Sequence, residues 1–351
     1  MFRTTQRVRD FKYLLAYLIP FWTFTGLYLH GLWCYGGILF AFGLVPIGEA
    51  LLGYALPQEE AGTQQRRLAN SFFDTLLYLN VLFIYGGALL FAQLLASNTL
   101  ETYEFIGLTL SVGVMFGANG INVGHELGHR GRPWERWIAR SLLLPSLYLH
   151  FYIEHNRGHH VNVGTYPDPS TARFGESLYV FWPRTIVMTY LNAWKIEQKR
   201  LQKKRISGLY RPNAMIGYTL FTTGYLATFA YFFGPKVMIG LIGAASVGAL
   251  LLETINYIEH YGLTRAVLPS GKVERITEQH SWNSNHQLGR IVLYELTRHS
   301  DHHGTAGKPF QTLNNRPGAP QLPFGYPTCM LLALCPPLWF KIMHPRLQQL
   351  K

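Results

Sequence analysis

Charged side chains and cysteines are both scarce in this sequence of 351 residues. Asp, Glu, Lys and Arg make up 14% of the chain, against about 25% in an ordinary soluble domain. The three cysteines, Cys34, Cys329 and Cys335, form no CxxC pair. This spacing excludes a disulfide framework and an iron–sulfur knuckle, and it predicts ordinary reduced thiols. The N-terminus also lacks a short apolar stretch with a small-residue cleavage site, so we expect its first apolar run to be a retained span.

Long apolar runs are abundant instead, in a chain that is 48% hydrophobic and 15% aromatic. Six runs are long enough to cross a hydrocarbon core of about 30 Å. They cover approximately residues 13–33, 37–56, 72–95, 105–124, 213–233 and 237–256. Polar sequence is concentrated at 130–212 and 261–351. We therefore predict one all-α integral membrane domain over residues 1–351, a bundle of six transmembrane helices with a helical cytoplasmic cap formed by the two polar regions.

The net charge of +12 is distributed unevenly along the chain. Lys and Arg precede the first span, separate spans two and three, and crowd the long loop between spans four and five. The positive-inside rule then places both termini and every basic loop in the cytoplasm of a multi-pass protein. Such a face contacts lipid headgroups and can also attract an acidic protein; we expect no nucleic acid partner. Glu49 and Asp74 fall within predicted spans, where a charge is functional or lies near the interface.

Nine of the fourteen histidines form four tight clusters, each next to an apolar segment on the predicted cytoplasmic side. Neutral imidazole is the commonest metal-ligand side chain. Histidines three or four residues apart share one helical face and can hold one ion or two adjacent ions. The clusters therefore predict a polynuclear metal site with these ligands: His125, His129, His155, His159, His160, His260, His299, His302 and His303.

A carboxylate accompanies each cluster, and metal-bound imidazoles usually donate their second N–H to such a group. The candidates for this orienting role are Glu126, Glu154, Glu259 and Asp301. Ordinary hydrogen-bonded histidines would explain any single cluster, but nine in ligand-spaced groups on one membrane face favour a metal site. The other five are isolated or badly spaced, and we do not predict them as ligands: His30, His150, His280, His286 and His344.

Ligand number indicates which metal binds. Zinc sites use four ligands, whereas nine imidazoles suit two octahedral ions with room for an oxygen ligand. Iron connects nitrogen-rich sites with oxygen chemistry. The apolar setting suggests a lipid-soluble substrate. A metal transporter is the alternative from another class, but transport sites lie near the bilayer midplane rather than at one face.

Four strings resemble the membrane-bound non-haem diiron alkane hydroxylases within the fatty acid desaturase and hydroxylase superfamily. They are Asn122-Val-Gly-His-Glu-Leu-Gly-His129, Glu154-His-Asn-Arg-Gly-His-His160, Asn256-Tyr-Ile-Glu-His-Tyr-Gly-Leu263 and Arg298-His-Ser-Asp-His-His303. The first, second and last histidine boxes are shared with membrane desaturases and xylene-type hydroxylases, whereas the full second string and the third string are much more particular to alkane hydroxylases. Arg130 stands where lysine is frequent in the family, and Thr297 where glutamine is frequent.

The resemblance implies an alkane 1-monooxygenase of the bacterial inner membrane. It implies two iron ions held by the nine histidines on the cytoplasmic side, and O2-dependent hydroxylation of the terminal methyl of n-alkanes, which we expect to be of medium length. Electrons would come from NAD(P)H through rubredoxin reductase and a separate rubredoxin. The family string Tyr166-Pro-Asp-Pro adds Asp168 as a further candidate for orienting a ligand. The alternative is a related diiron enzyme acting on alkyl-aromatics or fatty acyl chains.

Overall fold

The computed structural model describes residues 9–54, 62–204 and 213–350. Within these ranges the chain forms helices, turns and loops, and β-structure is limited to isolated bridges. The predicted all-α class is therefore confirmed. Three of the elements labelled η are single π-helical segments, η3, η4 and η5, and the others labelled η are 3-10 helices.

The N-terminal elements are η1 Phe11–Tyr17, α2 Leu18–Leu29, η2 Gly31–Tyr35, α3 Gly36–Leu39, η3 Phe40–Leu44, α4 Val45–Leu52, α5 Thr63–Leu68, α6 Ser71–Tyr78, α7 Asn80–Ser97, α8 Thr102–Met115, η4 Phe116–Ile121 and α9 Asn122–Gly128. The C-terminal elements are α10 Pro133–Leu143, α11 Phe151–Glu154, η5 His155–His159, α12 His160–Asn162, α13 Leu178–Lys203, α14 Ala214–Phe233, α15 Val237–His260, η6 Glu278–His280, α16 Gln287–Val292, α17 His299–Gly304, η7 Phe310–Thr312, α18 Tyr326–Ala333 and α19 Pro336–Gln348.

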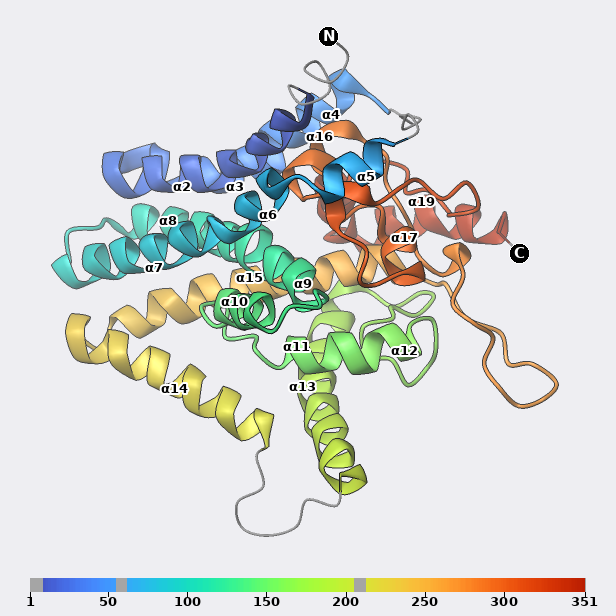
Figure 1. Cartoon of the computed structure of the whole chain (residues 1–351). Coiled ribbons are helices and arrows are strands. Elements are labelled where there is room, and N and C mark those ends of the chain that lie inside the picture. Colours follow the sequence, from blue (N-terminus) through green and yellow to red (C-terminus); the bar gives the residue numbers. More distant parts are fainter. Residues whose placement is uncertain (1–8, 55–61, 205–212, 351) are drawn as a thin grey trace.

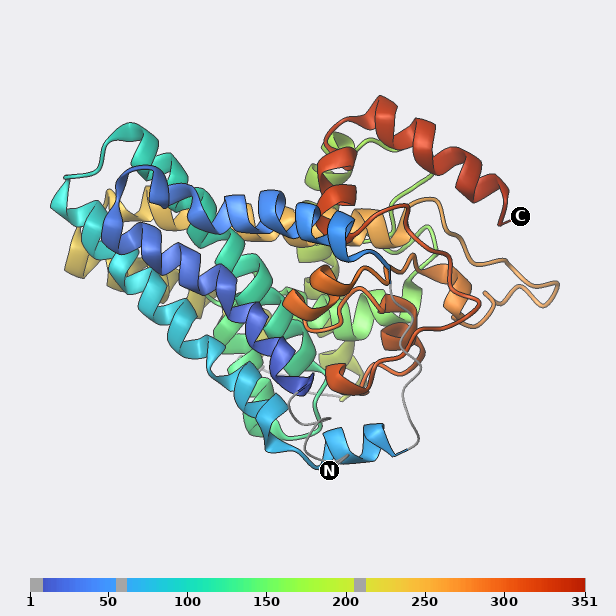
Figure 2. The same ribbon diagram turned by 90° about the horizontal axis from the view of Figure 1, so that it is seen from above.

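Long and short helices occupy opposite ends of the molecule. Helices α2, α7, α8, α14 and α15 extend toward one end, whereas the short helices α16 and α17, together with α19, gather at the other (Figures 1 and 2). Helix α13 runs across α15, to which the Trp182 indole is tied by a hydrogen bond to Thr254 of 3.1 Å (Figure 1). Helices α12, α17 and α19, which come from both polar regions, lie at the end opposite the long helices, and we refer to the elements gathered there as the cap (Figures 1 and 2).

Four helical stretches of the described chain are long and apolar enough to cross a membrane: Gly31–Leu52, Ser71–Ser97, Thr102–Gly128 and Val237–His260. They coincide with four of the six expected spans. The other two expected spans correspond to η1 with α2 and to α14, which are not among the four. Length and composition thus support a membrane protein with four candidate spans.

Close backbone contact joins α8 to α15. A Cβ atom on Gly113 would lie 2.4 Å from the Cβ of Val247, and one on Gly248 would lie 3.2 Å from the Gly113 carbonyl oxygen. Small residues at such positions let membrane helices approach closely and gain van der Waals contact. This contact fixes α9, which continues from α8, relative to the end of α15, and both carry histidines of the predicted site.

A buried ionic cluster fixes the segment before α17. Glu295 accepts a hydrogen bond from the Tyr13 hydroxyl (2.6 Å) and pairs with Arg290 (2.8 Å) and Arg298 (3.3 Å). Burial alone would raise the pKa of Glu295, but the two guanidinium groups outweigh it and lower the pKa to about 2. The cluster therefore holds a permanent carboxylate that links η1 to the helix with the last histidines.

The two acidic residues expected within spans have structural contacts. The Oε1 atom of Glu49 accepts the backbone N–H of Gly289 (3.1 Å), so this carboxyl group attaches α4 to α16. Asp74 lies at the start of α6 and contacts Arg130 at 3.4 Å. Both contacts join a candidate span to the cap.

Candidate metal centre

The nine predicted histidines lie together, although they come from four distant parts of the sequence. Helix α9 and the residue after it provide His125 and His129, η5 and α12 provide three more, α15 ends with His260, and α17 provides the last three. Their nitrogens form two compact groups, and within each group one ligand atom per residue lies within 4.8 Å of all the others. The first group is His125, His129, His155, His160 and His302; the second is His159, His260, His299 and His303.

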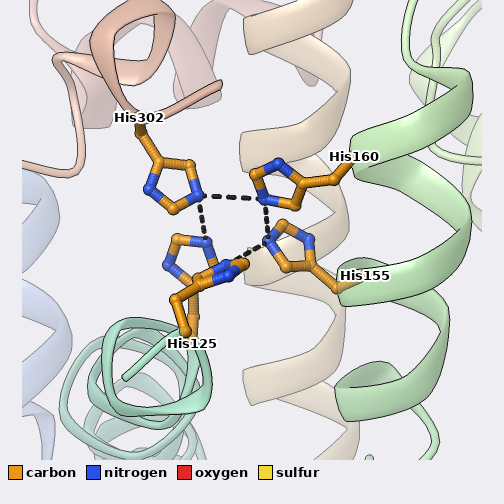
Figure 3. Close-up of side chains that lie close together, drawn as sticks. His125, His155, His160 and His302 are labelled. Atoms are coloured by element: carbon orange, nitrogen blue, oxygen red, sulfur yellow. Dashed lines mark hydrogen bonds between the residues drawn. The ribbon is translucent and has the colours of Figure 1, made fainter. Parts of the chain in front are cut away.

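The first group is a chain of Nε2 atoms that face one another. His302 lies 3.0 Å from His125 and 3.1 Å from His160, and His155 lies 3.0 Å from His160 and 3.1 Å from His129 (Figure 3). Nitrogens bound at about 2.1 Å to one ion, at right angles to each other, are about 3.0 Å apart. The observed spacing is therefore that of neighbouring ligands.

Hydrogen bonding alone does not account for these contacts. A neutral imidazole Nε2 carries either one hydrogen or one lone pair, so it takes part in one such bond. In a chain of five nitrogens with four contacts, at most two contacts can then be hydrogen bonds. The remaining contacts would hold two polar nitrogens about 3 Å apart without a hydrogen bond, which is unfavourable in a buried site. A shared cation removes this conflict, and the group fits a metal site.

A π-helical turn decides how the second histidine cluster is divided. We expected His155 and His159 to share a helical face, but η5 covers both residues and widens the turn to an i→i+5 repeat. His155 consequently meets His160, while His159 faces the second group. The two rings still stack, with centroids 5.3 Å apart, so the pair serves two adjacent groups rather than one.

The last cluster supplies ligand atoms to both groups from one helix. His299 and His303 are four residues apart on α17, and their Nε2 atoms lie 2.9 Å apart in the second group. His302 turns to the first group instead. Helix α17 therefore connects the two groups.

Polar partners orient two members of the second group, His159 and His260. His159 Nδ1 is 2.9 Å from a carboxylate oxygen of Asp168, which also accepts the Thr171 hydroxyl (2.6 Å). His260 Nδ1 is 3.2 Å from the backbone carbonyl of His280. In both residues the outer nitrogen has a partner, which leaves Nε2 directed at the group, as is usual for metal-bound histidine. The buried Nε2 of His159 has no hydrogen-bond partner, so a cation is the contact it lacks.

Burial keeps most of these imidazoles uncharged. Burial, and then repulsion between neighbouring imidazolium forms, lowers the pKa far below its ordinary value in His155, His160, His299, His302 and His303. His159 differs: burial alone would lower its pKa, but Asp168 outweighs burial and raises it. Metal binding requires the neutral imidazole, so the low pKa values prepare these nitrogens for a cation.

The predicted carboxylates have different surroundings. Of the five predicted carboxylates, Asp168 and Glu259 contact a nitrogen of the nine histidines. The Oε2 atom of Glu259 lies 3.2 Å from His299 Nε2, and its Oε1 accepts the Tyr326 hydroxyl at 2.9 Å. That nitrogen faces the group, so Glu259 lies beside the ligand atoms rather than behind them. Glu126 pairs with Arg130 (2.8 Å), Glu154 accepts from Asn192 (3.0 Å), and Asp301 pairs with Lys308 and Arg316. These three anchor the surrounding elements.

Two features of the site were not predicted. The orienting partner of His260 is the peptide carbonyl of His280, and a backbone group carries no residue-type signal. Tyr326, which donates a hydrogen bond to Glu259, lies 67 residues away from it in sequence, at the start of α18. The five remaining histidines lie outside both groups.

An apolar cavity leads to both histidine groups. Aliphatic side chains from the long helices form much of its wall, among them Val45, Val114 and Leu251. His125 and His155 of the first group and His299 of the second also line it, next to Glu259. The structure thus brings an apolar space directly to the imidazoles.

Comparison with known proteins gives four consistent similarities. Residues 101–316 match the fatty acid desaturase family. The chain is 36% identical to alkane 1-monooxygenase 2 of Alcanivorax borkumensis, over 95% of this chain and 88% of that protein. It is 38% identical to alkane 1-monooxygenase 1 of Pseudomonas aeruginosa (95% and 89%) and 29% identical to the xylene/toluene monooxygenase hydroxylase component of Pseudomonas putida (95% and 89%).

Proposed function

The chain belongs to the alkane 1-monooxygenase family, and from this membership we propose that it converts the terminal methyl group of an n-alkane to a primary alcohol. The reaction consumes an alkane, O2, two electrons and two protons, and it yields the alcohol and water. The observation that carries the proposal is the apolar cavity that ends at both histidine groups. A substrate without polar atoms needs such a wall, and its reacting carbon must meet the metal site.

The residues that would hold the metal are the nine histidines, five for one iron and four for the other. The fit rests on the facing Nε2 atoms of the first group and on the unpartnered His159 Nε2 of the second. Iron bound at these nitrogens supplies the O2 activation that an unactivated primary C–H bond requires. Asp168 holds the His159 ring in one orientation.

The protein's own contribution is binding, orientation and the exclusion of water. Apolar side chains remove the alkyl chain from water, at about 25 cal/mol per Å² of apolar surface. Confinement aligns the chain so that its end meets His125 and His299. The Glu259 carboxyl group lies where the cavity meets the imidazoles, and its Oε1 atom accepts a hydrogen bond from the Tyr326 hydroxyl. We infer that Glu259 holds a proton at this boundary between the cavity and the imidazoles.

The proposal includes the membrane arrangement and the electron supply. In this arrangement η1 with α2, and also α14, cross the membrane in addition to the four candidate spans, which gives six spans. Both termini and the histidines then lie in the cytoplasm of a bacterial inner-membrane protein. Residues 1–351 form one such domain. A soluble rubredoxin delivers electrons from NAD(P)H through its reductase. The basic character of the cytoplasmic loops supports an acidic donor.

The test is turnover of the purified protein with Fe(II), rubredoxin, its reductase and NADH on octane, xylene and a fatty acyl-CoA. We expect iron-dependent formation of 1-octanol. Oxidation of xylene alone would indicate that the substrate is an alkyl-aromatic compound rather than an alkane. The 29% identity to the xylene/toluene monooxygenase component favours this second candidate. Oxidation of the acyl-CoA alone would indicate a desaturase-type substrate. Absence of bound iron in active protein would overturn the metal assignment.

A further inference from the structure

Helix α14 diverges from its neighbours and leaves a second groove, separate from the substrate cavity. Figure 1 shows α14 inclined away from α15, with α13 running across the opening. The groove lies between α13, α14 and α15, and its wall includes Ile186, Ala249 and Leu250. Only three of the twenty residues of α14 are buried: Met215, Tyr218 and Tyr225. A membrane helix with this much free surface requires a lipid or another apolar partner beside it.

One buried polar side chain in this groove has a nitrogen without a hydrogen-bond partner. His150 lines the groove and is 7% exposed, and its buried Nε2 has no hydrogen-bond partner. Its ring is held between Tyr148 and Tyr190, with centroids 4.3 Å and 5.3 Å away. A buried polar nitrogen usually has a partner. A ligand with oxygen atoms in or next to an alkyl chain would supply one.

A strongly basic groove adjoins the apolar one. Its wall carries seven basic side chains and one carboxylate, Glu197, which pairs with Arg200 at 2.7 Å. The basic residues are Arg136, Arg140, Arg157, Lys199, Arg200, Lys203 and Lys204. Tyr218 lines both grooves, so the basic wall and the apolar wall meet at this residue. One continuous surface thus changes from cationic to apolar along α13 and α14.

We propose that the two grooves together bind one anionic phospholipid, with its phosphate in the basic groove and an acyl chain in the apolar groove. Charge complementarity selects the head, since a juxtamembrane Lys or Arg attracts an anionic lipid by about 1 kcal/mol. The apolar groove selects a chain, which a free phosphate or an acidic protein would not provide. His150 Nε2 is then a partner for the ester oxygens between head and chain. This site is independent of the alkane reaction.

The first experiment measures binding of phosphatidylglycerol to the delipidated, detergent-solubilised protein by native mass spectrometry. Phosphatidylcholine of the same chain length tests the head, and sn-glycerol 3-phosphate tests a free anion. The triple variant R136Q/K199Q/K203Q removes three charges from the basic groove. We expect its affinity for phosphatidylglycerol to fall on the order of a hundredfold. The control R132Q/K272Q/R275Q removes three exposed charges elsewhere and should bind as the wild type does.

The second experiment obstructs the apolar groove. Thr223 is exposed on α14 and lines the groove, so T223W should fill it without disturbing the core. The matched variant T228W places the same side chain at an exposed position of α14 outside the groove. We expect T223W to weaken phosphatidylglycerol binding at least tenfold and T228W to leave it unchanged.

Three outcomes would overturn the proposal. Equal binding of phosphatidylcholine would remove the role of the basic groove. Binding of sn-glycerol 3-phosphate as tight as that of the lipid, with T223W unaffected, would indicate a site for a free anion. Unchanged lipid binding by the triple variant, with a raised KM for reduced rubredoxin, would assign the basic groove to the electron donor.

Discussion

The two histidine groups are built from the same side chain but are held in place differently. In the first group the imidazoles contact one another through Nε2, and His302, the central contact of His125 and His160, has no carboxylate partner in the described chain. In the second group, Asp168 orients His159 and Glu259 lies beside His299. The first group depends on helix geometry and packing, whereas two members of the second, His159 and His260, also have a hydrogen-bond partner at Nδ1. The number of ligands in a group therefore does not by itself decide how sensitive that group is to substitution.

The largest effect is expected from removing one ligand of either group. His302 and His303 are neighbours on α17, but they belong to different groups. We expect H302A and H303A each to lower 1-octanol formation by more than the roughly 10- to 100-fold typical of lost outer partners. The assay is turnover with saturating iron and reduced rubredoxin. Activity near the wild-type level in either variant would remove that group from the reaction.

Glu295 should affect both groups together, because it anchors the segment before α17. E295Q leaves Arg290 and Arg298 buried without their carboxylate, and breaking such a buried pair costs about 3–5 kcal/mol. We expect a lower unfolding temperature in detergent and weaker metal retention at both groups. Loss confined to one group would show that α17 is not a shared support.

The same carboxylate predicts a pH dependence of stability. Its pKa of about 2 in the folded protein lies below the value of about 4.3 for an unfolded glutamate. Its contribution is therefore complete above pH 4.3 and is lost as the pH falls toward 2. Thermal unfolding between pH 5 and pH 3 should show a steeper loss in the wild type than in E295Q. Parallel curves would contradict the assignment.

Asp168 and Glu126 provide the direct contrast between the groups. D168N weakens the partner of His159 Nδ1, and we expect a 10- to 100-fold loss of activity and a loss of metal from the second group alone. E126Q changes a carboxylate that pairs with Arg130 and contacts no histidine in the described chain. We expect its activity to remain within about threefold of the wild type, since exchange of an anchoring group leaves the ligands unmoved. Similar losses in the two variants would contradict the difference between the groups.

The sequence predicted which residues form the metal centre better than it predicted how they divide into two groups. The all-α class and the nearness of nine histidines followed from apolar run length and ligand spacing. The separation of His155 from His159 did not, because a single π-helical turn shifts the repeat and has no clear residue signature. The role of Asp168 was suggested only by family resemblance. The peptide oxygen beside His260 and the distant Tyr326 depend on tertiary packing, which local patterns do not encode.

The number of membrane spans also shows where sequence reasoning reaches its limit. Four expected spans coincide with long apolar helices, whereas η1 with α2 and α14 do not meet the same measure. Helix α14 leaves most of its surface uncovered, and its neighbour α13 is apolar at first and basic toward its end. Hydropathy gives the length of such elements, but it does not reveal the groove between them.

The most direct test of the two-group account is the iron content per chain of the wild type, H302A and H303A, measured after anaerobic loading with Fe(II) and removal of free metal. The account predicts two irons in the wild type and one in each variant, because each substitution opens a different group. A wild type that retains one iron or none, or variants that both retain two, would contradict it.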